Sequence, residues 1–217
     1  MHWQFTGPNG VTTAVELPHT WNARDGQDGG NDYWRGCCTY CTRFAAPVYD
    51  PAQQQVWLQF EGVNASAAVL LNGQQLCTHD GGYSTFRAEV TELLQAENQL
   101  TVRVDNSVND RVYPQKADFT FYGGIYRDVS LLVVNKNHIA LGHFGDTGVK
   151  ITPALQENSA DIQVETLVEG EGTVAVELLD AEGRTVAKGE GENTFLHLDA
   201  PHLWNGIKDP YLYTCVV

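Results

Sequence analysis

The chain has 217 residues, enough for two ordinary β domains or one large one, so a sizeable hydrophobic core needs no disulfide bonds. It carries 13 Lys and Arg against 27 Asp and Glu, and this net charge of −14 repels nucleic acid and anionic membrane surfaces. A hydrophobic fraction of 42% with 21 glycines is typical of a folded, turn-rich protein and excludes disorder as the main state. No apolar run approaches the about 18 residues of a membrane helix.

The first 134 residues predict β-strands, because short runs of alternating or β-branched residues recur between Gly, Asn and Pro. Asn72-Gly73 predicts a tight type I′ hairpin, since both residues accept positive φ angles. One helical turn is expected at Val90–Leu94, where Thr91 would cap it. Together these elements favour a jelly-roll sandwich. The predicted strands are Thr12–Leu17, Cys38–Phe44, Gln55–Phe60, Ala67–Leu71, Gln74–Thr78, Ser84–Glu89, Leu100–Asp105 and Val129–Val134.

The polar segment Asn135-Lys136-Asn137 interrupts this pattern and predicts two domains, residues 1–136 and 137–217. Seven further strands in about 80 residues match an immunoglobulin-like sandwich, so the predicted class is all-β throughout. The final strand has no polar tail, and we expect the second domain to be truncated there. The predicted strands are His138–Phe144, Val149–Thr152, Asp161–Val168, Thr173–Leu179, Arg184–Gly189, Thr194–Leu198 and Tyr211–Val217.

Three of the five cysteines lie close together, at Cys37, Cys38 and Cys41. Strand alternation sends Cys37 and Cys41 to one face and Cys38 to the other. One thiol pair without a second cluster is not a zinc site, and such crowding is not a disulfide framework. We interpret these residues as reduced thiols that are buried as small hydrophobic side chains.

The loop Asp25–Asp32 offers oxygen ligands and flexible turns, which calcium favours. It lacks the bidentate Glu of a calcium loop at the twelfth position, where Gly36 stands. A polar surface loop or a substrate-facing loop is therefore the preferred interpretation.

Aromatic residues near Asp118 are the strongest indication of a ligand. Phe119, Phe121, Tyr122 and Tyr126 follow this carboxylate closely. Ring faces pack against the C–H bonds of a sugar while a carboxylate accepts hydrogen bonds from its hydroxyls. The alternative is that these rings belong to the core of the sandwich.

Six stretches follow one another with a specific order and spacing: LPHTWN at 17–22, DYWRGCCTYCTRF at 32–44, FEGVNASAAVLLNGQQLCTHDGGYSTF at 60–86, ENQLTVRVDN at 97–106, DFTFYGGIYRDVSLLV at 118–133 and PHLWNGIKDPYLYT at 201–214. Together they resemble glycoside hydrolase family 2, the β-galactosidase and β-glucuronidase family. The first five resemble its N-terminal sugar-binding, galactose-binding-like jelly roll. The sixth resembles its immunoglobulin-like domain.

The resemblance implies a parent protein in which a TIM barrel follows, carrying an acid/base Glu and a nucleophile Glu. No such barrel fits in 217 residues, so no catalytic residue is expected in this chain. We expect the N-terminal, non-catalytic part of a retaining β-galactosidase, inactive by itself. The alternative is a freestanding carbohydrate-binding module.

The resemblance also implies substrate contacts. In galactosidases of this family an Asp before the Gly-Ile-Tyr/Phe-Arg strand contacts sugar hydroxyls, and Asp118 stands at that offset from Gly124. An Asn in the loop before the second strand also contacts sugar, and either Asn22 or Asn31 is the matching position. Tyr122 completes the expected substrate-binding set.

The remaining expectations concern supporting residues and partners. Arg127 and Asp128 are interpreted as a structural ion pair, and Trp204 and Tyr213 as core of the second sandwich. The expected partners are a β-galactoside or related carbohydrate and the downstream barrel, without nucleic acid or membrane, and a homo-oligomer stays open. No cofactor or metal is expected in this chain, although the resemblance implies Mg or Na in the parent. Because residues 1–4 lack signal-peptide features, we expect a bacterial-type cytoplasmic location, or secretion if a leader was removed.

Overall fold

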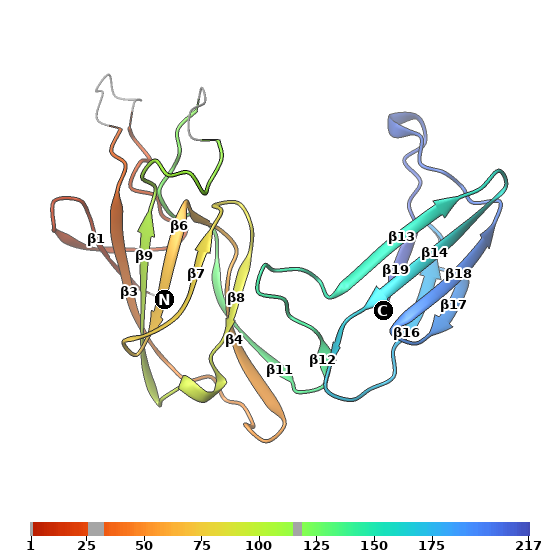
Figure 1. Ribbon diagram of the computed structural model, residues 1–217, viewed down its shortest axis with the longest axis horizontal. Helices are drawn as coiled ribbons and strands as arrows, with labels where there is room; N and C mark the ends of the chain where they lie inside the picture. The colour runs from red at the N-terminus through yellow and green to blue at the C-terminus, as the bar shows by residue number, and fades with distance from the viewer. Residues whose placement is uncertain (1, 26–32, 115–118) are drawn as a thin grey trace. The chain divides into compact units, whose positions relative to one another are not determined.

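The computed structural model describes residues 2–25, 33–114 and 119–217. These residues form β-strands and two short 3₁₀ turns, which confirms the predicted all-β class. The chain folds into two compact units, one of residues 1–135 with 143–145 and one of residues 136–142 with 146–217 (Figure 1). Within the described ranges no helix is long and apolar enough to span a bilayer.

The first unit is an antiparallel β-sandwich. One sheet has the order β2-β1-β3-β9-β6-β7, the other β11-β4-β8, and β10 and β5 form a short separate ladder. The strands are β1 (Trp3–Thr6), β2 (Thr12–Val15), β3 (Cys37–Ala45), β4 (Gln54–Phe60), β5 (Val63–Asn64), β6 (Ser66–Leu71), β7 (Gln74–Asp80), β8 (Phe86–Glu89), β9 (Glu97–Asp105), β10 (Gly124–Ile125) and β11 (Val129–Asn135).

Strict alternation along the long strands builds the core of this unit. In β4, Val56, Leu58 and Phe60 are buried while the residues between them are only half-buried. Successive side chains of a strand point to opposite faces, so one face of each sheet is apolar and packs inward. Phe60 stacks on Phe86 of β8 with ring centroids 4.8 Å apart.

The Asn72-Gly73 hairpin is confirmed. Asn72 has φ 52° and Gly73 has φ 83°, as a type I′ turn requires, and Leu71 pairs with Gln74 across it.

The predicted cap at Thr91 is wrong: Val90 precedes the turn Thr91–Leu93, and no side chain caps it. The Thr91 hydroxyl instead accepts a hydrogen bond from the backbone N–H of Val56, 2.9 Å away, and so joins the turn to β4.

The cysteine interpretation holds only in part. All five thiols are free, and Cys38 is buried in the core as expected. Cys37 is exposed and Cys41 half-buried, because both point to the outer face of the sheet. Burial raises the pKa of the Cys38 thiol to about 12, so this residue stays a neutral core side chain.

The second unit has two three-stranded antiparallel sheets, ordered β13-β14-β18 and β17-β16-β19, and a short β12-β15 ladder. The predicted strand His138–Phe144 is wrong beyond its second residue. His143 belongs to the first unit instead, where the N–H of Arg87 donates to its carbonyl oxygen at 2.7 Å. The strands are β12 (His138–Ile139), β13 (Val149–Leu155), β14 (Ser159–Thr166), β15 (Val168–Glu169), β16 (Ala175–Leu179), β17 (Thr185–Glu190), β18 (Asn193–Asp199) and β19 (Thr214–Val216), with a 3₁₀ turn at Gly206–Lys208.

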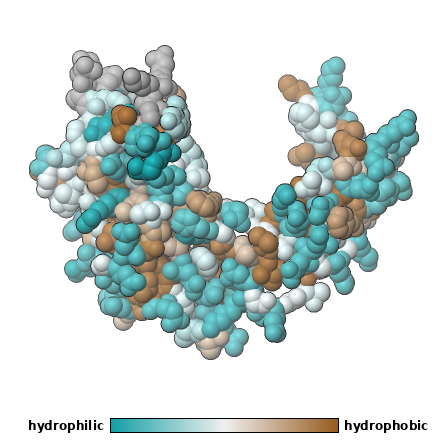
Figure 2. Space-filling model, viewed as in Figure 1, coloured by the Kyte–Doolittle hydropathy of each residue, from teal (hydrophilic) through white to brown (hydrophobic). Residues whose placement is uncertain are grey.

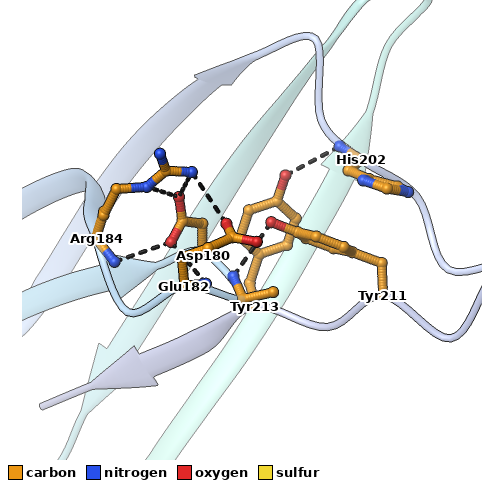
Figure 3. A network of polar contacts seen from close by, with 7 residues as sticks. Asp180, Glu182, Arg184, His202, Tyr211 and Tyr213 are labelled. Carbon is orange, nitrogen blue, oxygen red and sulfur yellow. Dashed lines mark hydrogen bonds and ion pairs between the residues drawn. The ribbon is translucent and has the colours of Figure 1, made fainter.

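Two tyrosine hydroxyls hold irregular backbone in the second unit (Figure 3). The hydroxyl of Tyr211 accepts from the N–H of Ala181 in the β16–β17 turn at 3.2 Å. The hydroxyl of Tyr213 accepts from the N–H of His202 at 2.9 Å. The ring of His202 stacks on Tyr211 at a centroid distance of 4.0 Å, so the segment 201–213 is held by rings as well as by hydrogen bonds.

Trp204 is not part of the core of this unit, contrary to the sequence-based expectation, because it is 65% exposed. Tyr213, in contrast, packs against the buried cluster of the second unit. Hydrophobic residues are visible at the surface among hydrophilic ones, as Figure 2 shows. A motif rich in aromatic residues therefore did not distinguish core from surface.

His79 is a buried titratable group of the first unit. Its Nε2 lies 3.0 Å from the carbonyl oxygen of Gly81 and 3.1 Å from Ser84 Oγ, and its ring stacks on Phe86. Its Nδ1 is buried and has no hydrogen-bond partner among the described residues. Burial, with a smaller contribution from nearby His143, lowers the pKa of His79 below 6.5.

Replacing Phe60 by Ala tests the core. The ring is fully buried, so Phe60→Ala should lower the free energy of unfolding by about 3–5 kcal/mol. Urea denaturation followed by tryptophan fluorescence measures this change. Val48→Ala is the control, since Val48 is fully exposed, and should change stability by less than about 0.5 kcal/mol. Equal effects of the two variants would contradict the core assignment.

The lowered pKa of His79 predicts a pH dependence of stability. The unfolded state binds the proton more readily, so stability is fully present above about pH 6.5 and falls as the pH drops below it. In urea denaturation from pH 7.5 to 5, His79→Gln should flatten this slope, while His2→Gln, an exposed control, should leave it unchanged. Part of the slope should persist because burial lowers the pKa of His19 as well. A slope identical to wild type in His79→Gln would disprove the assignment.

Candidate functional site

The segments that carry the predicted site residues Asn22 and Tyr122 run side by side in the first unit. The N–H of His19 donates to the carbonyl oxygen of Ile125 at 2.8 Å, and the N–H of Trp21 donates to that of Gly123 at 3.3 Å. The Thr20 hydroxyl also donates to the Gly123 carbonyl, at 2.8 Å. The Leu-Pro-His-Thr-Trp-Asn segment is thus anchored on the Gly-Gly-Ile segment, about 100 residues later in the chain.

The glycine pair makes this approach feasible. A Cβ on Gly123 would lie 2.0 Å from the Trp21 ring, and one on Gly124 would lie 2.4 Å from the carbonyl oxygen of His19. Gly124 also has φ +140°, which side-chain-bearing residues rarely adopt. The glycines of this motif therefore serve close backbone contact.

Asn22 lies at the centre of this contact and is completely buried. Its Oδ1 accepts from the N–H of Gly123 at 2.7 Å and from Asn106 Nδ2 at 3.1 Å. Its Nδ2 donates to the carbonyl oxygen of Trp34 at 2.8 Å and to Asp25 Oδ2 at 2.6 Å. Because the whole amide is engaged and inaccessible, this geometry does not support the predicted direct contact between Asn22 and a sugar and instead gives Asn22 a positioning role.

Asn106, which directly follows β9, is the second member of this buried amide pair. Besides bonding Asn22, its Nδ2 donates to the carbonyl oxygen of Phe121 at 3.0 Å, and its Oδ1 accepts from the N–H of Gly36 at 2.8 Å. Asn106 ends the stretch ENQLTVRVDN, and the sequence alone predicts no role for it. The sequence feature that could have pointed to it is an amide side chain directly after a predicted strand.

The buried amide pair, Asn22 and Asn106, bonds to Asp25 and Trp34, which lie on either side of residues 26–32. It also bonds to Phe121 and Gly123, a few residues after 115–118. Tyr33 adds a bond, because its hydroxyl accepts from the N–H of Phe121 at 2.6 Å. Asn31, Asp118 and most of the candidate calcium loop Asp25–Asp32 lie outside the described residues. Their predicted roles stay predictions.

Tyr122 lines a cavity of about 240 Å³ together with Thr20, Asn64, Tyr83 and Tyr126. Tyr122 is 39% exposed and Tyr83 60% exposed, and Phe119 is also exposed, so these rings are not core. Tyr126 is more enclosed: its hydroxyl donates to the carbonyl oxygen of Gly82, and burial raises its pKa to about 12. Its phenol therefore stays neutral. Tyr83 was not among the residues that the sequence predicted to bind substrate.

Arg127 does not form the expected ion pair with Asp128 in the described structure. Its Nη1 donates to the carbonyl oxygens of Tyr83 at 3.0 Å and Glu61 at 3.3 Å. Its guanidinium carbon lies 5.7 Å from the centre of the Tyr126 ring, within cation–π range. Arg127 thus fixes the loop that carries Tyr83.

No three side chains of His, Cys, Asp or Glu converge on a metal-sized site in the described ranges. The residues described here therefore offer no such ligand set for the magnesium or sodium expected in the parent.

Asn106→Ala tests the buried amide pair. It removes the acceptor of the Gly36 N–H, the side-chain donor to the Phe121 carbonyl oxygen and one of two donors to Asn22 Oδ1, so the free energy of unfolding should fall by about 2–4 kcal/mol. Hydrogen exchange should show lost protection at Gly36 and Gly123. The control is Asn158→Ala, an exposed Asn that should change neither quantity. Asn106→Asp, which points a carboxylate at two carbonyl oxygens, should destabilise at least as much, and wild-type stability in either Asn106 variant would contradict the assignment.

Two family models match successive, overlapping parts of the chain. Residues 30–154 match the family model described as glycosyl hydrolase 2 galactose-binding domain-like, and residues 143–217 match that of glycosyl hydrolases family 2. A β-glucuronidase of Bacteroides fragilis is 33% identical over 98% of this chain and 33% of its own length. A β-galactosidase of Thermoanaerobacter pseudethanolicus is 32% identical over 60% of this chain and 18% of its own length.

The fold matches solved structures of the same kind. The crystal structure of an FMN-binding β-glucuronidase from Facaelibacterium prausnitzii L2-6 superposes with a TM-score of 0.88 at 34% identity, over 98% of this chain and 35% of that one. This chain spans about a third of the length of the two β-glucuronidases and less of the β-galactosidase. The galactose-binding-like sandwich and the second, immunoglobulin-like sandwich are thus those of a known family, and the chain belongs to the glycosyl hydrolases of family 2.

Proposed function

We propose that this chain is the N-terminal, sugar-contacting part of a retaining glycosidase whose two catalytic Glu residues lie in a downstream TIM barrel. One observation carries the proposal: the buried amide pair holds the segments that border Asn31 and Asp118. Family membership and the partial coverage of longer relatives support it.

In the proposed reaction an acid Glu protonates the leaving oxygen while a nucleophile Glu forms a glycosyl-enzyme, which water then hydrolyses. Asp118 accepts hydrogen bonds from sugar hydroxyls and so orients the glycoside for attack. Asn31 is the remaining candidate for an amide contact to sugar. Asn22 and Asn106 position the loops without touching the substrate.

We propose a β-galactoside as the substrate, since a relative named β-galactosidase is 32% identical over 60% of this chain. A β-glucuronide is the second candidate. The match to the Bacteroides fragilis β-glucuronidase favours it, because that match covers 98% of this chain against 60% for the β-galactosidase.

Two further points are proposals of the same kind. The parent would act in a bacterial-type cytoplasm, consistent with the free thiols, and would bind any magnesium or sodium through other residues. A freestanding carbohydrate-binding module is the alternative function, favoured by the exposed tyrosines at the cavity.

Asp118→Asn in the proposed longer glycosidase, expressed from the longer reading frame that encodes it, tests the substrate contact. A hydrogen bond to a charged group contributes about 1.5–3 kcal/mol, so kcat/KM for an aryl β-galactoside should fall about 10- to 100-fold. Aryl β-glucuronide assayed in parallel decides between the two substrates. Asp110→Asn is the matched control, an exposed carboxylate in a nearby segment, and should leave kcat/KM unchanged. An Asp118 variant as active as wild type would remove this residue from the site.

The 217-residue chain assayed alone should release no aryl group from either glycoside, because both catalytic carboxylates are proposed to lie elsewhere. Measurable turnover by the pure chain that persists after further purification would contradict the proposal that catalysis lies outside these 217 residues. A longer reading frame that binds sugar without hydrolysing any aryl glycoside would favour the binding-module alternative.

A further inference from the structure

The tyrosine cavity, lined by Thr20, Asn64, Tyr83, Tyr122 and Tyr126, draws its walls from distant parts of the first unit. Thr20 precedes the buried Asn22, and Asn64 lies in β5. Tyr83 belongs to the loop between β7 and β8, and Tyr122 and Tyr126 flank β10. No local sequence pattern brings these residues together.

Hydrogen bonds fix the backbone around this cavity. Asn64, almost completely buried, donates from Nδ2 to the carbonyl oxygen of Tyr122 at 2.8 Å. Thr20 holds the carbonyl of Gly123, and Arg127 holds that of Tyr83. Each contact engages the main chain and none uses the Tyr83 or Tyr122 ring, so the backbone that carries these rings is fixed before a ligand binds.

Exposed aromatic surface lines the cavity. Tyr83 and Tyr122 are both exposed, and among the described residues neither phenol hydroxyl forms a hydrogen bond. The Tyr83 and Tyr126 rings lie 6.2 Å apart at 59°, so their planes form two inclined walls. A tyrosine presents an apolar face and a polar tip, which together match the C–H face and the hydroxyl rim of a sugar.

Size and charge restrict the ligand. The volume of about 240 Å³ is below the roughly 300–1,000 Å³ of pockets that take drug-sized molecules, so the cavity suits a single ring. All five lining residues are uncharged. A carboxylate placed there would lose hydration, and the neighbouring guanidinium of Arg127 is already engaged by the carbonyl oxygens of Tyr83 and Glu61 and by the Tyr126 ring.

We propose that the tyrosine cavity binds one neutral pyranose ring, with the C–H face of the sugar stacked on Tyr83 and Tyr122 and its hydroxyls within reach of their phenol oxygens. The proposal rests on the proposed function in one respect, that the protein acts on glycosides. It adds Tyr83 as a specificity residue and neutral sugar as the ligand class.

The test is a titration of the 217-residue chain, carrying ¹³C-labelled tyrosine, with methyl β-galactopyranoside up to about 50 mM. Ring resonances of Tyr83 and Tyr122, assigned from single-residue variants, should shift with a millimolar dissociation constant. Methyl β-glucuronide should bind at least fivefold more weakly, because the lining carries no cation. Absence of ring shifts, or binding of the uronide as tight as that of the galactoside, would overturn the proposal.

Variants make the result specific. Tyr83→Ala should weaken binding at least fivefold, and Tyr83→Phe, which keeps the ring, should stay within about threefold of wild type. Tyr113→Ala is the matched control, a tyrosine that is more exposed than Tyr83 and lies outside the cavity, and should bind as wild type does. Circular dichroism checks that each variant is folded. Equal effects of Tyr83→Ala and Tyr113→Ala would disprove stacking on Tyr83.

The outcome separates this inference from the proposed function. If the longer protein hydrolyses glycosides but no sugar binds at the tyrosines of this chain, the cavity proposal is wrong and the proposed hydrolase function stands. Sugar binding at the tyrosines without hydrolysis by the longer frame would support the cavity and overturn the hydrolase.

Discussion

The hydrogen bond between the side chains of Asn22 and Asn106 is the constraint on which the candidate site depends. Both residues are completely buried, and their amides bond to two other segments of the first unit, residues 34–36 and 121–123. A buried polar group without a partner costs about 1–3 kcal/mol, so the arrangement is favourable only while every bond is formed. The loop ends therefore adopt one geometry together or lose it together.

Amides suit this position better than an ion pair would. Burying two opposite charges costs desolvation energy that their attraction offsets only with excellent geometry, whereas two amides need only matched donors and acceptors. The glycine pair at 123–124 supplies that match, because a side chain there would keep Trp21 and His19 from approaching.

Sequence periodicity predicted the regular part of the fold and little of the site. Alternation identified β4 and β6, and Asn-Gly identified the hairpin between β6 and β7, because both signals act over a few residues. The Asn22–Asn106 bond joins residues 84 positions apart, and no local pattern encodes it. The same limit explains why Thr91 was taken for a cap and Trp204 for core: each choice depends on packing partners that are distant in sequence.

The segment 121–123 shows how the amide pair and the tyrosine cavity depend on each other. Among the described residues, the backbone hydrogen bonds of Phe121, Tyr122 and Gly123 come from elsewhere in the unit. The partners are Tyr33, Asn106, Asn64, Asn22, Thr20 and Trp21. Asn64 bonds the main-chain carbonyl of Tyr122, so this support does not use the Tyr122 side chain, which stays available at the cavity. Loss of the buried amides would release Gly123 and Phe121 on both sides of Tyr122, and so would disturb the cavity wall without touching a residue that lines it.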